Sequence, residues 1–141
     1  QDPSTALGQA TAMDNYTPLA GTDTVLINTT AWFTLATINY TPHNNGVMLS
    51  FSGTFDDRNG NTGAYIELIL TADAGTTALA RRHIVLQDMN FHQSQVASID
   101  YRISPAGTLP ATYQIMARVV KAPYTAGRCI DRTFTLLEIN D

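Results

Sequence analysis

Residues 46–55 read G-V-M-L-S-F-S-G-T-F, and this stretch decides the fold. Its apolar side chains fall at alternate positions: Val47, Leu49, Phe51 and Phe55. Between them stand Met48, Ser50, Ser52 and Thr54. A period of two is the pattern of a β-strand with one face in a hydrophobic core. We therefore predict a central strand here, with a second face that also needs an explanation.

Further apolar and β-branched segments surround this strand. Residues 25–38 form one strand, or two joined by a kink at 28–31, and the other predicted strands are 64–72, 78–87, 91–104, 111–121 and 132–139. Asn59-Gly60 is typical of a tight turn, because both residues tolerate positive φ, and it predicts a hairpin that joins the central strand to 64–72. Residues 1–22 are small and polar, which indicates an extended N-terminal arm or linker ahead of a head domain at 23–141.

The number of strands and the absence of any convincing amphipathic helix predict an all-β fold. Eight or so strands separated by turn residues favour an antiparallel β-sandwich or barrel. About 8–10 strands suit a jelly roll, and an immunoglobulin-like sandwich fits the strand number almost as well. The missing Cys…Trp…Cys pattern speaks only weakly against the second fold.

Composition excludes several classes of function. Charged residues make up only 14% of the 141 residues, against roughly 25% in ordinary soluble domains, so the surface is polar but mostly uncharged. The net charge is −4 and Lys121 is the only lysine, which disfavours nucleic acid as a partner. No apolar run is long enough for membrane insertion. Cys129 is the only cysteine, so no disulfide can form within the chain.

Three short segments resemble a known family in their order and spacing. They are G-V-M-L-S-F at 46–51, A-G-T at 106–108 followed by A-T-Y-Q-I at 111–115, and L-L-E-I at 136–139. They resemble the tumour-necrosis-factor-like and complement globular-head jelly rolls, and particularly the head domains of bacteriophage fibres and spikes. Two positions depart from the family pattern: Met48 stands where many members have an aromatic residue, and only Phe134 represents the usual closing aromatic pair.

This resemblance implies a homotrimer whose threefold contact is lined by the sheet of the first, central and last strands. It gives the second face of the central strand a role, because Met48, Ser50, Ser52 and Thr54 then point toward the trimer interface. Small side chains let protomers approach closely, and a methionine fills irregular gaps. The alternative is a polar strand face that meets solvent.

One loop is the predicted ligand-binding segment, formed by Asp56, Asp57, Arg58, Asn59 and Asn61. It is rich in hydrogen-bonding groups, and its alternating oxygen donors superficially suggest a calcium loop. The glycine is out of place, however, and Leu68 occupies the position of the bidentate glutamate, so no metal and no cofactor are predicted.

Other polar clusters give weaker signals. Arg81-Arg82-His83 could grip a carboxylate or a sialic-acid-like group, although solvated charges on an edge strand explain it better. His43, His83 and His92 lack metal-site spacing, apart from the remote option of a threefold axis that gathers three copies of one histidine. The sequence contains no serine-nucleophile motif, and nothing in it indicates that Glu67 and Glu138 form a glycosidase pair, so no enzyme is predicted.

Two hypotheses of function follow. The first is a non-enzymatic trimeric head domain of a virion fibre, a spike or a similar extracellular appendage. It would attach to a host-surface receptor or glycan, with its N-terminal arm joined to a shaft or capsid protein. The second is a monomeric carbohydrate-binding module of a secreted multidomain protein, with Trp32, Tyr40, Tyr65 and Tyr124 as stacking candidates. Both hypotheses place the protein on a virion surface or outside the cell.

Overall fold

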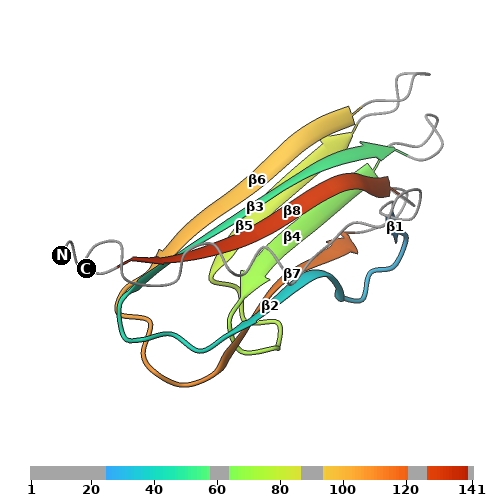
Figure 1. Ribbon diagram of the computed structural model, residues 1–141. Coiled ribbons are helices and arrows are strands. Elements are labelled where there is room, and N and C mark those ends of the chain that lie inside the picture. Colours follow the sequence, from blue (N-terminus) through green and yellow to red (C-terminus); the bar gives the residue numbers. More distant parts are fainter. Residues whose placement is uncertain (1–24, 58–63, 87–93, 121–126, 140–141) are drawn as a thin grey trace.

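The computed structural model of the chain describes residues 25–57, 64–86, 94–120 and 127–139 (Figure 1). These residues form an all-β fold with no helix, as the sequence predicts, and so none of them forms a helix that could cross a membrane. The eight strands are β1 (Val25–Ile27), β2 (Phe33–Tyr40), β3 (Gly46–Asp57), β4 (Ala64–Thr71), β5 (Ala80–Leu86), β6 (Ser94–Ile103), β7 (Ala111–Val119) and β8 (Gly127–Ile139).

Two four-stranded antiparallel sheets pack face to face. Sheet A has the strand order β1-β8-β3-β6, and sheet B has the order β2-β7-β4-β5. The chain changes sheet at every connection except the one from β4 to β5, so strands that are neighbours in a sheet are mostly distant in sequence. This alternation between two sheets is the jelly-roll topology, and the predicted fold class is confirmed.

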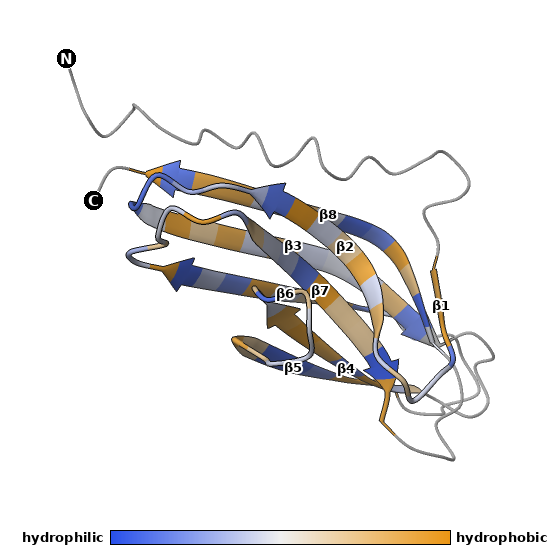
Figure 2. Ribbon diagram, turned by 90° about the horizontal axis from the view of Figure 1, so that it is seen from below, coloured by the Kyte–Doolittle hydropathy of each residue, from blue (hydrophilic) through white to orange (hydrophobic). Residues whose placement is uncertain are grey.

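The predicted central strand is confirmed in β3, which lies between β8 and β6. Its odd-numbered apolar side chains, Val47, Leu49, Phe51 and Phe55, are buried between the sheets. The ring of Phe51 meets Phe134 of β8 edge to face, with the ring centroids 6.3 Å apart. Figure 2 shows hydrophobic residues on the strands of both layers. Each such side chain removed from water stabilises the fold by about 1.5–3 kcal/mol.

The predicted hairpin between β3 and β4 was wrong. β3 pairs with β6 and β8 in sheet A, whereas β4 pairs with β5 and β7 in sheet B. The physical reason is that each strand buries a full apolar face, and placing them in opposite sheets lets these faces meet across the core. Asn59-Gly60 itself lies outside the described residues.

Several predicted boundaries also moved. Residues 25–40 form two strands in different sheets, which settles the alternatives in favour of a break. β8 begins at Gly127, five residues earlier than predicted, where it pairs with β1 and with the end of β3. The predicted N-terminal arm, residues 1–22, lies outside the described residues.

Gly53 on the inner face of β3 marks a close approach that a larger residue would disturb. A Cβ atom built there would lie 3.0 Å from the Phe55 ring, 3.1 Å from the Phe51 ring and 3.3 Å from the carbonyl oxygen of Asp131. We expect Gly53→Ala to lower the free energy of unfolding by about 1 kcal/mol, because overpacking forces the rings out of their preferred positions. Urea denaturation measures this change.

Ser94→Ala is the matched control for Gly53→Ala. Ser94 is exposed on the neighbouring strand β6, so its truncation should change the unfolding free energy by less than about 0.5 kcal/mol. Equal effects of the two variants would contradict the close approach at Gly53.

Candidate functional site

The outer face of sheet A carries four aligned rows of side chains across β6, β3 and β8. Residues directly opposite each other on paired strands share a face of the sheet. The register gives the rows Arg102–Met48–Leu137, Asp100–Ser50–Thr135, Ser98–Ser52–Thr133 and Val96–Thr54–Asp131. We call these twelve residues, with Leu26 of β1, the outer face of sheet A.

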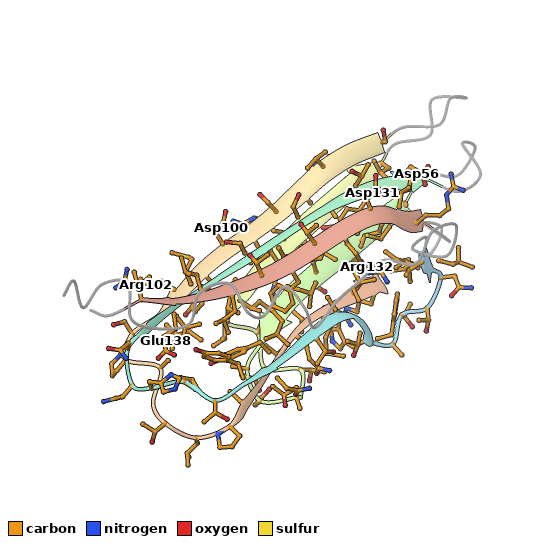
Figure 3. The ribbon with its side chains drawn as sticks, viewed as in Figure 1. Asp56, Asp100, Arg102, Asp131, Arg132 and Glu138 are labelled. Atoms are coloured by element: carbon orange, nitrogen blue, oxygen red, sulfur yellow. The ribbon has the colours of Figure 1, made fainter. Side chains whose placement is uncertain are left out.

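This face combines short hydroxyl side chains with exposed apolar ones. Its two middle rows consist of serines and threonines, except for Asp100. Leu26, Val96 and Leu137 are 37%, 66% and 40% exposed, and they are three of the five large apolar side chains that are exposed in the described part of the chain. Figure 3 shows Asp100 and Arg102 on β6, at the edge of the sheet. A second surface could therefore approach the middle of this face closely.

The four predicted interface residues all lie on this face. Met48, Ser50 and Thr54 are half-buried and Ser52 is exposed in the single chain. Their alternation with the buried residues of β3 is what the sequence pattern predicts. The threefold contact assigned to them stays a prediction.

The predicted ligand-binding loop is described only at its first residues. Asp56 belongs to β3 and is buried at 6% exposure, and Asp57 is the last residue of that strand. Arg128 of β8 donates to both carboxylate oxygens of Asp56, from Nε at 2.8 Å and from Nη2 at 2.6 Å. Arg58, Asn59 and Asn61 lie outside the described residues, so ligand binding by this set stays a prediction.

The pair of Asp56 and Arg128 should contribute to stability. We expect a double-mutant cycle with Asp56→Ala and Arg128→Ala to give a coupling energy of about 1–2 kcal/mol, because the carboxylate is buried and accepts two charge-assisted hydrogen bonds. Urea denaturation of the wild type, both single variants and the double variant measures it. A coupling energy near zero would contradict a structural role for Asp56.

A buried carboxylate at the opposite end of the sandwich was not predicted as a centre of interactions. Glu138 of β8 is fully buried and accepts hydrogen bonds from the Tyr40 hydroxyl at 2.6 Å, the His43 backbone N–H at 2.6 Å and the Asn45 backbone N–H at 3.4 Å. The His43 Nδ1 lies 2.8 Å from the Glu138 Oε1. Figure 3 labels Glu138 near one end of the sandwich and Asp56 near the other.

These contacts shift the pKa of Glu138 and of Tyr40. Burial acts to raise the pKa of Glu138, but the hydrogen bonds from Tyr40, His43 and Asn45 outweigh it and lower the pKa to about 2. Burial and the bond to this carboxylate raise the pKa of the Tyr40 hydroxyl above its ordinary value. Burial and the nearby charge of Glu138 raise the pKa of Tyr113 as well. Glu138 is therefore an ionised anchor for the chain that joins β2 to β3.

The anchored segment also contacts the connection between β6 and β7. The Asn44 backbone N–H donates to the Gly107 carbonyl at 2.7 Å, and the Ala106 N–H donates to the Asn45 carbonyl at 2.9 Å. Gly107 has a φ of +78°, which suits glycine. The two connections lie side by side at one end of the sandwich (Figure 1).

A second buried carboxylate, Glu67, lies on the outer face of sheet B. It gathers two residues of the predicted basic segment, because Arg81 and His83 of the edge strand β5 both contact its Oε2 atom. Arg82 alternates with them and does not join this contact; its Nη1 donates to the Arg81 carbonyl. The explanation by solvated edge charges is therefore incomplete for Arg81 and His83.

The histidines and aromatic residues considered as candidate ligands lie in different parts of the structure. The described residues hold no group of three or more metal-ligating side chains, and His92 lies outside them. His43 and His83 belong to the separate Glu138 and Glu67 clusters. Among the stacking candidates, Tyr40 binds Glu138, and Tyr124 lies outside the described residues. Trp32 and Tyr65 are half-buried next to the Glu67 cluster. The ring of Trp32 packs against the guanidinium of Arg118, which also donates to Glu67, and the ring of Tyr65 meets that of His83.

Comparison with known proteins supports the fold. No family model matches the chain, and no curated protein sequence matches it. Similar solved structures include a protein of infectious bursal disease virus, Gt strain, with a TM-score of 0.56 and 11% identity over 92% of this chain and 32% of that chain. A Stig cyclase, FisC from Fischerella sp. TAU, has a TM-score of 0.54 and 13% identity over 75% of this chain and 55% of that chain. A CBM4 carbohydrate-binding module has a TM-score of 0.48 and 13% identity over 80% of this chain and 70% of that chain.

At 11–13% identity these likenesses concern the fold alone, and the TM-score of the CBM4 module is too low to carry an argument. The chain spans about half the length of the cyclase and a third of the viral protein. The strand order, together with the similarity to the viral protein and the cyclase, defines the class of the protein as an antiparallel jelly-roll β-sandwich domain.

Proposed function

We propose that this chain is the non-enzymatic, trimeric head domain of a virion fibre, a spike or a similar extracellular appendage, and that it attaches to a receptor or glycan on a host surface. The resemblance of three segments to tumour-necrosis-factor-like and complement globular-head jelly rolls supports this proposal. So does the fold that the chain shares with a protein of infectious bursal disease virus.

The observation that carries the proposal is the outer face of sheet A. Sheet A contains the first, central and last strands of the fold, β1, β3 and β8, which the resemblance assigns to a threefold contact, together with the edge strand β6. Hydroxyl rows at its middle allow close approach, while Leu26, Val96 and Leu137 offer apolar area to bury. These three side chains lie in the two end rows and on β1, so a contact with another protein surface would bury them at its margins, around the hydroxyl rows at its middle.

The two buried carboxylates support a function without catalysis. Glu67 and Glu138 each receive several hydrogen bonds from donors within the chain. The pKa of each lies below its ordinary range, because these bonds outweigh the effect of burial. A general acid needs a raised pKa instead, so both residues suit a structural role better.

Three copies would also suit attachment. A host surface presents its receptor or glycan many times, so weak individual sites gain overall affinity when they are linked. The N-terminal arm would connect the head to a shaft or capsid protein. The place of action would be a virion surface or the extracellular space.

The mass of the chain in solution tests the trimer. Sedimentation equilibrium should give about three times the chain mass of 15.3 kDa at micromolar concentration. A mass of 15.3 kDa at every concentration would refute the trimeric head and favour the second candidate below.

The second candidate is a monomeric carbohydrate-binding module. Its supporting observation is the pair of half-buried aromatic residues Trp32 and Tyr65 beside the Glu67 cluster. Aromatic rings with polar neighbours suit sugar rings, which have apolar faces and polar edges. A monomeric mass together with binding on a glycan array would favour this candidate.

A further inference from the structure

A continuous row of side chains crosses the outer face of sheet B. Arg118 of β7 lies opposite Glu67 of β4, and Glu67 lies opposite His83 of β5. Trp32, just before β2, extends the row, because the Arg118 guanidinium lies 4.5 Å from the centroid of its ring. The row runs from the residue before β2 across β7 and β4 to β5, which is three strand spacings, and so it is about 14 Å long.

Glu67 is the centre of this row. Its side chain is only 4% exposed although it stands on the outer side of the sheet. The Arg118 Nε and Nη2 atoms lie 2.9 Å and 2.8 Å from Oε1, while Arg81 Nη1 and, at 3.4 Å, His83 Nε2 contact Oε2. Burial acts to raise the pKa of Glu67, but these partners outweigh it and keep the pKa below its ordinary value.

The cluster therefore carries a local excess of positive charge. Two guanidinium groups face one ionised carboxylate, in a chain whose net charge is −4. A guanidinium has five N–H donors, and the contacts to Glu67 occupy two on Arg118 and one on Arg81. The side chains of Arg81 and His83 are 50% and 46% exposed, so their outer atoms can reach a ligand.

Aromatic rings stand near both ends of the row. Trp32 is half-buried, and the Arg118 guanidinium lies over its ring. Tyr65 meets His83 edge to face with the ring centroids 5.6 Å apart, and its hydroxyl lies 3.4 Å from the His83 Nδ1. Cations held between amphipathic rings match a ligand that combines sugar rings with negative charge.

We propose that the outer face of sheet B binds an acidic oligosaccharide. Arg81 and His83 hold a sugar carboxylate, Glu67 and Arg118 position them, and neighbouring sugar rings lie along Trp32 and Tyr65. The inference names the ligand class for the attachment proposed above and rests on that function, but the face lies on the sheet opposite to the proposed trimer contact.

Calorimetric titration of the intact chain with oligogalacturonate tests this site, with a neutral oligogalactoside of the same length as the reference. We expect saturable binding of the acidic sugar and at least about tenfold weaker binding of the neutral one, because the neutral sugar lacks the charge-assisted bonds. Equal affinities, or no binding of oligogalacturonate, would overturn the proposal. Equal binding of oligoglutamate would overturn the assignment to a saccharide.

Two variants locate the site on the protein. Arg81→Gln should weaken oligogalacturonate binding about tenfold, whereas Arg82→Gln, one position along the same strand and outside the Glu67 contact, should leave it unchanged. Equal losses in the two variants would overturn the location. If Arg81→Gln unfolds, Trp32→Leu takes its place. Trp32→Leu should also weaken oligogalacturonate binding about tenfold, and an unchanged affinity would overturn the location.

Sedimentation of the titrated sample separates this inference from the proposed trimer. A monomer that binds oligogalacturonate through Arg81 refutes the trimer and supports the saccharide site. A trimer that binds no acidic sugar supports the proposed assembly and refutes the site.

Discussion

Replacing Ser52 by arginine is expected to convert the proposed trimer into monomers. Ser52 stands in the row with Ser98 and Thr133, at the middle of the outer face of sheet A. A long cation there would hold the protomers apart or lose its hydration in the contact, at a cost of several kcal/mol per ion. Sedimentation equilibrium at micromolar concentration should then give a mass of 15.3 kDa.

The matched control is Thr34→Arg on β2, an exposed position in sheet B. It adds the same charge and should leave the mass at about three times that of the chain. Both variants should retain the circular dichroism of the wild type, because both side chains point away from the core. A trimeric Ser52→Arg protein would contradict the assignment of this face to the contact.

Replacing Glu138 by glutamine is expected to lower the free energy of unfolding by about 3 kcal/mol at pH 7. The carboxylate is fully buried and accepts bonds from Tyr40, His43 and Asn45, whereas an amide offers one acceptor oxygen and two N–H donors. Urea denaturation at pH 7 measures this loss. Asp131→Asn, on an exposed position of the same strand, is the control and should change stability by less than about 0.5 kcal/mol.

The loss should depend on pH in a defined direction. Because the pKa of Glu138 falls from an ordinary 4.5 to about 2 on folding, its contribution is complete above pH 4.5 and disappears as the pH falls toward 2. The difference in unfolding free energy between wild type and Glu138→Gln should therefore shrink by about 3 kcal/mol as the pH falls through this range. Glu67, whose pKa is also lowered, keeps its own contribution in both proteins. A constant difference between them from pH 7 to pH 3 would contradict the ionised anchor.

The sequence predicts a strand well where the alternation of apolar and polar residues within that strand is strong. The alternation at Val47, Leu49 and Phe51 is local and strong, so both the existence of β3 and its buried face follow from it. The sequence does not predict which strands pair with each other. Asn59-Gly60 indicates a turn but carries no information on which sheet the next strand joins, and the core decides that by bringing apolar faces together.

The carboxylate clusters escaped prediction because their members are far apart in the chain. His43 and Glu138 are 95 residues apart, and Glu67 is 51 residues from Arg118. A signal existed for Glu138, which shares the parity of the buried Phe134 and Leu136 and must therefore have polar partners inside the fold. For Glu67 the signal was weaker, because its parity points outward and an exposed charge there needs no explanation.

Because Cys129 is buried, the reaction of its thiol can be used to measure how often the edge of sheet A opens. The thiol is fully buried on β8, and Cys129 lies opposite Val25 of the three-residue strand β1. A thiol-specific reagent can reach it only when this edge opens, so the rate of labelling reports the free energy of that opening in the native protein. Since the chain has one cysteine, every labelled molecule is modified at the same position, and no substitution is needed to install the reporter.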